Sequence, residues 1–195
     1  MENEVVFSLQ NQSKGFSPVR AGSNRIVDTQ DQYRILGGYI EDLFSGQPVF
    51  QATDGNVRLL SKPDEIILGV FNGVWYVDTQ GDTIFRPYWP TGTAIQTGSI
   101  ATANVFAADG LFQIGADADT LYADTDTFAD LTPVQGEGGS TVTGRSSVQV
   151  DYSQIDATLQ TENMVRIVER SQQPGNVRLL IVKFARPIFN GIVGS

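Results

Sequence analysis

Short apolar runs, each ended by a turn-forming sequence, follow one another along most of the chain. The runs are rich in Val, Ile, Phe and Tyr, and Gly, Thr, Ser, Asp and Asn separate them. β-Branched and aromatic residues favour strands, whereas the separating residues favour turns. The pattern predicts a mainly β fold, an antiparallel β-barrel or sandwich with little helix.

The clearest predicted hairpin lies between residues 66 and 90. One strand is expected over Ile66–Val77, a short loop over Asp78–Asp82, and a return strand over Thr83–Trp89 that ends at Pro90. Gly81 lets the loop adopt a positive φ without strain. Further strands are expected at Thr102–Ala107, Leu111–Ile114, Ser147–Asp151, Met164–Glu169 and Val177–Arg186.

Residues 33–60 have apolar positions that would also suit one face of a helix. The adjacent Gly37 and Gly38 argue against a stable helix, because glycine has a low helix propensity. Turn sequences at Ser45–Pro48 and Thr53–Asn56 favour strands joined by turns instead.

Three segments depart from the strand pattern and define the expected domain organisation. Residues 1–25 are largely polar and predict an extended N-terminal arm, with a disordered tail as an equal alternative. Residues 26–195 predict a single β domain with a long acidic loop around residues 116–144. A short helix is expected over Tyr152–Asn163.

The composition excludes several kinds of chemistry. The chain has a net charge of −9 and contains neither Cys nor His. Disulfides, thiolate nucleophiles, zinc sites built on Cys or His, and Ser-His-Asp triads are therefore ruled out. The acidic charge disfavours nucleic-acid binding, and no apolar run is long enough to cross a bilayer. We expect a soluble chain without a secretory signal and without a nucleic-acid or membrane partner.

Carboxylates are the remaining candidates for a metal site or for catalysis. Oxygen ligands for calcium could come from an aspartate cluster, but its spacing lacks the Gly and Glu of an EF-hand, so a solvated loop and no cofactor are expected. A glycosidase needs two acids across a cleft, and nothing in the sequence selects a pair, so we expect no enzymatic activity. The cluster comprises Asp117, Asp119, Asp124, Asp126 and Asp130, and the glycosidase candidates are Glu41, Asp42, Asp64, Glu65, Glu162 and Glu169.

The aromatic residues of the predicted hairpin indicate an interaction surface. Alternation places Trp75 on the opposite face to Tyr76, and it places Phe85, Pro87 and Trp89 together on one face of the return strand. Both faces are apolar, as they are in the last predicted strand. A sheet with one solvated face alternates apolar with polar residues, so the second face needs another layer or another subunit. Because little helix is expected, we favour subunit contacts.

The interface candidates come from the arm, the hairpin and one turn. They are Val5, Phe7, Phe16, Trp75, Tyr88, Trp89 and Arg145. Arg145 could pair with an acid on a neighbouring subunit. The alternative interpretation is a sugar-binding platform formed by Trp75, Tyr88 and Trp89, because sugars stack on exposed rings.

The order of three segments resembles a family of tailed-phage head proteins, the capsid decoration or cement proteins. The segments are YRILGGYIEDLFSGQPVFQATDG (33–55), GVFNGVWYVDTQGD (69–82) followed by YWP (88–90), and GRSSVQVD (144–151). The resemblance implies an antiparallel β domain that sits on the outer surface of the capsid, often as a homotrimer, and clamps capsomers of the major capsid protein together. No catalytic motif accompanies it, and a tail or baseplate component is the alternative virion role.

The physical interpretation is compatible with that resemblance. An acidic protein suits the exterior of a shell better than its DNA-filled interior. Many modest contacts repeated by symmetry give high avidity. The function expected from the sequence is therefore structural, with a carbohydrate-binding module as the second hypothesis and an acid-pair glycosidase as the third.

Overall fold

The computed structural model describes residues 14–19, 29–60, 66–132, 138–159, 163–170 and 178–185. In these ranges the chain forms sixteen strands and one turn of 3-10 helix, η1 (Tyr122–Asp124), with no α-helix. The expected mainly β class is confirmed. A sandwich-like arrangement fits the antiparallel sheets, and the described ranges show no closed barrel.

Six antiparallel strands form the first large sheet, which we call sheet I. Their order is β1-β10-β16-β15-β11-β14. The strands are β1 (Ser17–Pro18), β10 (Phe112–Gly115), β16 (Leu179–Phe184), β15 (Val165–Arg170), β11 (Phe128–Thr132) and β14 (Gln149–Asp156). Apolar side chains of these strands fill core I, which includes Phe112, Ile114, Leu131, Val150, Ile167, Leu180 and Phe184.

The second large sheet, sheet II, has the order β2-β9-β6-β4-β5, with β7 paired to β6 beside this path. Its long strand β6 pairs with β9 along one edge. Along the other edge, β6 pairs first with β4 and then with β7. The strands are β2 (Thr29–Ile35), β9 (Ala101–Ala107), β6 (Ile67–Val77), β4 (Pro48–Gln51), β5 (Val57–Leu59) and β7 (Thr83–Arg86).

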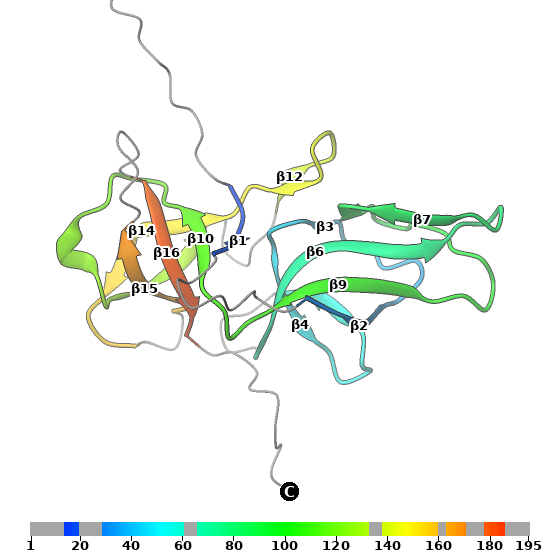
Figure 1. Ribbon diagram of the computed structural model, residues 1–195, viewed down its shortest axis with the longest axis horizontal. Helices are drawn as coiled ribbons and strands as arrows, with labels where there is room; N and C mark the ends of the chain where they lie inside the picture. The colour runs from blue at the N-terminus through cyan, green and yellow to red at the C-terminus, as the bar shows by residue number, and fades with distance from the viewer. Residues whose placement is uncertain are drawn as a thin grey trace, which may run out of the picture.

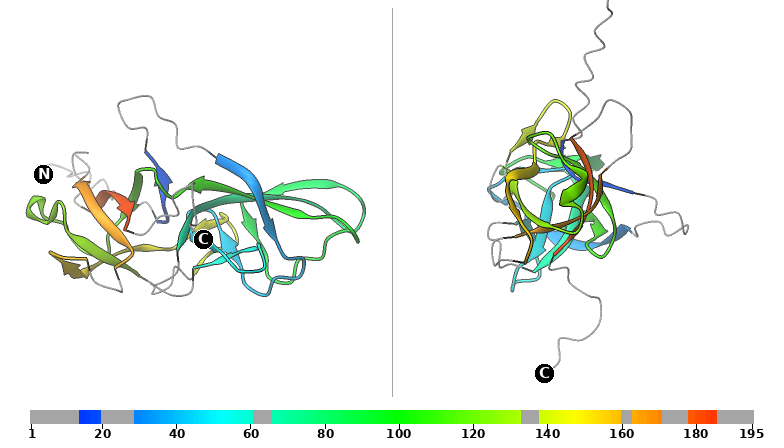
Figure 2. Two further views of the ribbon diagram at one scale, coloured as in Figure 1. Left: turned by 90° about the horizontal axis from the view of Figure 1, so that it is seen from below. Right: turned by 90° about the vertical axis from the view of Figure 1, so that its left-hand side faces the viewer.

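Two further sheets have two strands each. β3 (Leu43–Phe44) pairs with β8 (Tyr88–Trp89), and β12 (Gly139–Ser140) pairs with β13 (Arg145–Ser146). The two large sheets form two lobes along the long axis of the molecule, and the β12–β13 hairpin reaches from sheet I toward the lobe of sheet II (Figures 1 and 2).

Most predicted strands are present with ends shifted by one or two residues, except that β14 ends five residues later than the predicted Asp151. The first hairpin strand is β6, but the return strand is interrupted at Pro87 and forms β7 and β8. Residues 33–60 form strands and turns, as the sequence predicts. The helix expected over Tyr152–Asn163 is wrong at its start, because β14 continues to Asp156 and pairs there with β11.

The long loop expected around residues 116–144 is also wrong in part. β11 lies between β15 and β14 in sheet I, with Ala129 and Leu131 fully buried. A strand with only two inward apolar side chains, one of them small, does not raise the local hydrophobicity enough to be recognised.

The predicted N-terminal arm belongs to the domain where it is described. β1 pairs with β10, and Phe16 is buried in core I against the rings of Phe112 and Phe184. The candidates Val5 and Phe7 lie outside the described residues.

Candidate protein interaction surface

Sheet II has two apolar faces, and only the inner one is covered along its full length. The inner face packs in core II, which includes Ile35, Val49, Val57, Phe71, Val74, Tyr76, Ala103 and Val105. On the outer face, Val70 of β6 pairs with Phe106 of β9, and both side chains pack into core I. The lobe of sheet I therefore covers one half of the outer face.

The other half of the outer face is exposed, and the strand register places a row of four side chains on it. Arg34 of β2 pairs with Thr102 of β9, Thr102 pairs with Trp75 of β6, and Trp75 pairs with Phe85 of β7. Directly paired residues of adjacent strands lie on the same face. Trp75 is 47% exposed and Phe85 is 43% exposed. The two rings contact each other with centroids 4.9 Å apart and planes tilted by 47°.

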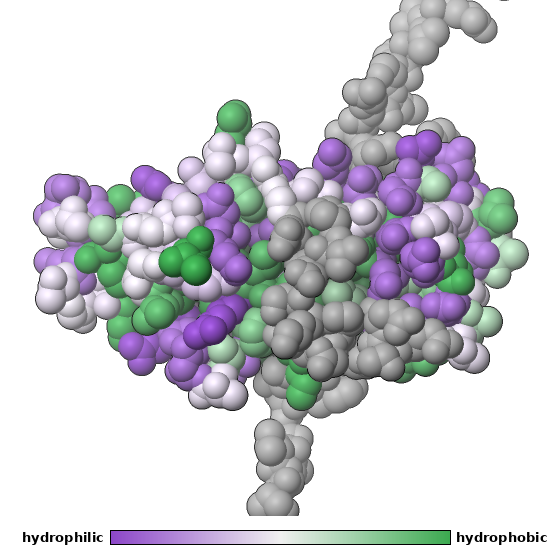
Figure 3. All heavy atoms as spheres, turned by 180° about the vertical axis from the view of Figure 1, so that it is seen from behind, coloured by the Kyte–Doolittle hydropathy of each residue, from purple (hydrophilic) through white to green (hydrophobic). Residues whose placement is uncertain are grey.

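Two further apolar side chains extend this row at the strand ends. Leu36 follows Ile35, the last residue of β2, and Ile100 precedes Ala101, the first residue of β9. Because Ile35 pairs with Ala101, Leu36 and Ile100 stand at the same end of the two strands. Leu36 is 53% exposed and Ile100 is 49% exposed. We call Leu36, Trp75, Phe85 and Ile100 together the outer patch. A space-filling view from behind also shows apolar side chains among polar ones on this lobe, at the left (Figure 3).

A bulge in β6 determines which side chains reach the outer patch. The register between β6 and β9 shifts between Phe71 and Gly73, so that Asn72 is an extra residue and Trp75 stays on the outer face. Gly73 has φ +149°, and a Cβ atom there would lie 2.6 Å from Cζ of Phe85. The Phe85 ring therefore rests directly on the glycine backbone.

The interruption at Pro87 reverses the predicted placement of Trp89. Instead of sharing a face with Phe85, Trp89 is fully buried in core II, where its ring meets Tyr76 edge-on at 5.7 Å. Alternation predicts faces only within a continuous strand, and β7 ends at Arg86. Trp89 and Phe16 are thus core residues, and neither is available to a partner.

The candidates Tyr88 and Arg145 come together at the base of the β12–β13 hairpin. The half-buried Tyr88 ring stacks on Phe44 at 5.7 Å with planes 12° apart. Gly144 approaches Pro87 and Tyr88, and Gly139 lies on the Phe44 ring, where a Cβ atom would come within 2.3 Å of ring carbons. The hairpin is thereby fixed to the lobe of sheet II.

The tip of this hairpin projects into solvent. Val142 is 93% exposed. Arg145 is exposed and forms no ion pair with any residue that the structure describes. The hairpin is therefore a second, smaller surface that presents an apolar side chain at its tip and a cation at its base.

The sugar platform of three aromatic residues is not formed. Trp89 is buried, Tyr88 is half-buried in its stack on Phe44, and only Trp75 exposes its ring.

Three residues of the aspartate cluster form ion pairs or a hydrogen bond with residues in sheet I or next to it. Asp119 pairs with Arg178 at 2.7 Å, Asp126 pairs with Arg166, and Asp124 accepts a hydrogen bond from the Tyr152 hydroxyl. Burial, followed by this hydrogen bond to Asp124, raises the pKa of Tyr152. Within the described ranges, no group of three or more acidic side chains is arranged to hold a metal ion.

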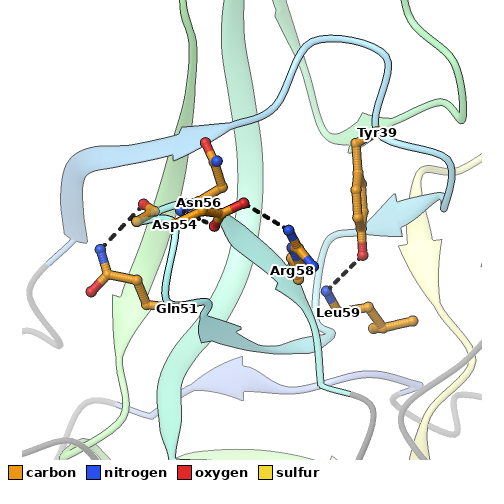
Figure 4. Close-up of polar contacts among 7 residues, drawn as sticks. Tyr39, Gln51, Asp54, Asn56, Arg58 and Leu59 are labelled. Atoms are coloured by element: carbon orange, nitrogen blue, oxygen red, sulfur yellow. Dashed lines mark hydrogen bonds and ion pairs between the residues drawn. The ribbon is translucent and has the colours of Figure 1, made fainter.

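Two titratable groups with shifted pKa values, Asp54 and Tyr39, lie at and beside the turn between β4 and β5 (Figure 4). Asp54 accepts a hydrogen bond from the Asn56 backbone N–H at 3.0 Å and pairs with Arg58 at 2.7 Å. The Asn56 hydrogen bond is the main cause that lowers the pKa of Asp54. Burial, together with a hydrogen bond to Glu41, raises the pKa of Tyr39, whose oxygen accepts the Leu59 N–H at 3.2 Å. These contacts hold in place the turn between β4 and β5 and the loop between β2 and β3 that contains Tyr39 and Glu41.

The three glycosidase candidates that the structure describes do not form a recognisable pair. Glu41 bonds to Tyr39, Asp42 accepts the Thr91 N–H at 2.6 Å, and Glu169 lies on β15. Asp64, Glu65 and Glu162 lie outside the described residues.

Sequence reasoning found Trp75 but missed Leu36, Phe85 and Ile100 as surface residues. Leu36 and Ile100 each stand next to a buried residue at a strand end, so their exposure can be predicted only once the strand register is known.

No family model, curated protein or solved structure matches the chain. Among the described residues, no helix has the length and apolar character needed to span a membrane.

Proposed function

We propose that the chain is a virion structural protein, a capsid cement or decoration protein that binds the outer capsid surface and stabilises contacts between capsomers. The outer patch is the observation that carries this proposal. Trp75 and Phe85 lie on a sheet face whose other half is buried within the chain, and Leu36 and Ile100 stand at the ends of the neighbouring strands; all four side chains are 43–53% exposed. Contiguous exposed apolar surface on a protein commonly marks a contact with another protein.

The residue types on this face favour contact over catalysis. Trp and Arg are enriched among the residues that dominate binding energy at interfaces, and both occur in the row Arg34–Thr102–Trp75–Phe85. The β12–β13 hairpin, with Val142 at its tip and Arg145 at its base, offers a second contact. Two separate contacts suit a protein that binds more than one subunit at once.

The virion context of the proposal rests on the resemblance to tailed-phage decoration proteins. Under it, the partners are the major capsid protein and further copies of the chain, which assemble as a homotrimer. The acidic net charge of −9 agrees with a location outside the shell. Each contact is modest, and symmetric repetition over the shell makes the binding strong.

Co-sedimentation with capsids that lack the chain tests the proposal. We expect the wild-type protein to sediment with capsids, and we expect Trp75→Ser combined with Phe85→Ser to reduce binding about tenfold or more. Leu121→Ser is the matched control, because Leu121 is 64% exposed and precedes η1, which packs on β15 of sheet I. Binding that is equally strong in all three proteins would contradict a role for the outer patch. Wild-type protein that sediments with tails instead of capsids would favour the tail or baseplate role.

A further inference from the structure

We propose that residues 14–19, which we call the strap, are an exchangeable strand. In an assembly of copies, the strap of one copy leaves the seam between β10 and β14 of its own chain and fills the same seam of a neighbouring copy. This goes beyond the proposed function, which names a homotrimer but assigns no contact between copies.

The seam is a place in sheet I where one further strand completes the hydrogen bonding. A parallel bridge joins Ala116, next to β10, directly to Val150 of β14. N-terminal to this bridge, the strap lies between the two segments, because it bonds to both, and Figure 1 shows β1 beside β10. The other edge of β10 is already paired with β16. The seam therefore accepts an extended segment in the manner of strand addition.

The backbone of the strap bonds to both sides of the seam. On the β10 side, β1 pairs along its length, and the Val19 N–H donates to the Leu111 carbonyl at 2.9 Å. On the β14 side, the Gly15 N–H donates to the Val148 carbonyl at 2.8 Å. In strand addition, such main-chain bonds supply affinity, and side-chain pockets supply specificity.

Phe16 is the anchor of the strap. Its side chain is 4% exposed, and its ring centroid lies 4.9 Å from that of Phe184 and 5.9 Å from that of Phe112 in core I. The ring is equally buried in the closed and in the exchanged arrangement, so it offers a partner no exposed surface. Exchange changes only the copy whose core I the ring completes.

Gly15 restricts which segment the seam accepts. It has φ +76°, and a Cβ atom there would lie 3.0 Å from Cβ of Ser146 and 3.2 Å from Cα of Gly46. The seam thus requires a glycine followed directly by an aromatic side chain that fits core I. Gly-Phe occurs once in the sequence, at residues 15 and 16, so the occupant that fits is the strap of another copy.

The contacts of the strap do not tie it to the elements that follow it in the chain. In the part of the chain that the structure describes, its hydrogen bonds and ring contacts are with Gly46 or with later residues. Residues 20–28 join it to β2, and a segment of that length spans up to about 30 Å. Exchange keeps every contact of the seated strap, so the cost of the exchanged arrangement is low. A high local concentration of copies favours it.

The exchanged contact joins two different surfaces, a strap and a seam. Such head-to-tail contacts close into rings when the rotation between copies permits it. A ring of three copies would be the homotrimer of the proposed function.

Introduced cysteines can report which copy holds the strap, because the chain contains no Cys. Ser17 pairs with Gln113, and directly paired residues have Cα atoms about 4.5–5.5 Å apart, which suits a disulfide. The full chain carrying both Ser17→Cys and Gln113→Cys is refolded and oxidised. We expect covalent oligomers to dominate at about 100 µM and intramolecular disulfides at about 1 µM, as mass action requires. The size of the largest covalent species gives the number of copies in the ring.

A mixture of the two single variants isolates the exchanged form. After joint refolding at about 100 µM, Ser17→Cys and Gln113→Cys chains should form a mixed disulfide that only exchange brings together. Residues Val77 and Thr83 provide the matched control, because they pair in the same way within one hairpin. The double variant Val77→Cys with Thr83→Cys should remain monomeric at both concentrations.

Further variants test whether cross-linking needs a seated strap. Adding Phe16→Ser to the strap-and-seam pair should lower the yield of covalent oligomers about tenfold or more, because the anchor is lost. Lys14→Ser should leave the yield unchanged, because Lys14 is exposed. A strap-and-seam pair that gives only intramolecular disulfides at about 100 µM would overturn the inference. So would a yield of oligomers that Phe16→Ser leaves unchanged.

This experiment and the capsid experiment fail separately. A chain that forms only intramolecular disulfides but sediments with capsids overturns strap exchange and leaves the proposed function standing. A chain that exchanges its strap but binds no virion particle supports the exchange and contradicts the proposed function.

Discussion

The two tryptophans of the chain have opposite environments, although they lie only fourteen positions apart. Trp75 exposes 47% of its surface beside Phe85, whereas Trp89 is fully buried beneath Tyr76. A bulge before Trp75 and a proline before Trp89 account for the difference, because each changes which face the following residues occupy.

Single-tryptophan variants should report these environments separately. Trp89→Phe leaves only Trp75, whose fluorescence should be red-shifted and readily quenched by acrylamide. Trp75→Phe leaves only Trp89, whose emission should be blue-shifted and quenched several-fold less. Equal quenching in the two variants would contradict the placement of Trp89 in core II.

The stability of the same variants should differ as well. Trp89→Ala removes a fully buried ring, and we expect it to lower the free energy of unfolding by about 3–5 kcal/mol. Trp75→Ala, at a half-exposed position, should lower it by no more than about 1–2 kcal/mol. Chemical denaturation followed by circular dichroism measures both. A larger loss of unfolding free energy in Trp75→Ala than in Trp89→Ala would show that the Trp75 ring is buried and that the outer patch is not an exposed surface.

Asp54 gives a pH prediction at the residue scale. Its lowered pKa means that folding favours the carboxylate, so this contribution to stability is complete above the unfolded pKa of about 3.9 and is lost as the pH falls through the folded value. Because the Asn56 backbone N–H is the main cause, Arg58→Gln should leave the pKa of Asp54 still below its ordinary value. A carboxyl NMR titration checks this. A return to the ordinary value in Arg58→Gln would assign the effect to the ion pair instead.

At the scale of elements, the β12–β13 hairpin connects the two lobes. Gly139 lies on the Phe44 ring, and the Ser45 N–H donates to the Gly144 carbonyl at 2.9 Å. In addition, the side-chain N–H of the buried Gln47 donates to the Gly138 carbonyl at 3.3 Å. These contacts hold the hairpin, which leads directly into β14 of sheet I, against β3 and β8, so the hairpin should fix how the lobes sit relative to each other.

Gly139→Val tests this role of the hairpin. A Cβ atom 2.3 Å from the buried Phe44 ring forces the ring or the hairpin to move, and we expect a loss of about 1–3 kcal/mol in stability. Hydrogen exchange should also rise in β3, β8 and the hairpin. Thr141→Val is the control, because Thr141 is exposed at the tip. Unchanged exchange in Gly139→Val would mean that the hairpin does not hold the lobes together.

The sequence predicts the regular elements better than it predicts their faces. Alternation and turn chemistry identify β6, β9 and β15 to within one or two residues. They fail at β11, where Ala129 and Leu131 are too few to make an apolar run, and they fail beyond Pro87, where the strand is interrupted. Two-sided apolar strands predict that both faces need cover, which for β6 stays a prediction where Trp75 is exposed. For β16, however, the chain itself buries Leu179 and Leu180, on opposite faces.

The outer patch could be predicted only in part for the same reason. Trp75 is identifiable as a residue of an apolar strand, but its association with Leu36 and Ile100 depends on which strands become neighbours. Strand order is a non-local property that short-range patterns do not specify.

At the scale of the whole molecule, two lobes share core I and leave one sheet face open. The lobe of sheet I covers half of the outer face of sheet II, and the exposed half presents Trp75 and Phe85. We propose that other proteins cover that exposed half when the chain is bound on the outside of a virion.

Reconstruction of the parent particle by cryo-electron microscopy tests this claim most directly. We expect density for the chain on the outer surface of the capsid, with the outer patch in contact with a neighbouring protein subunit. Particles that lack the chain, or a bound chain whose Trp75 and Phe85 face open solvent, would contradict it.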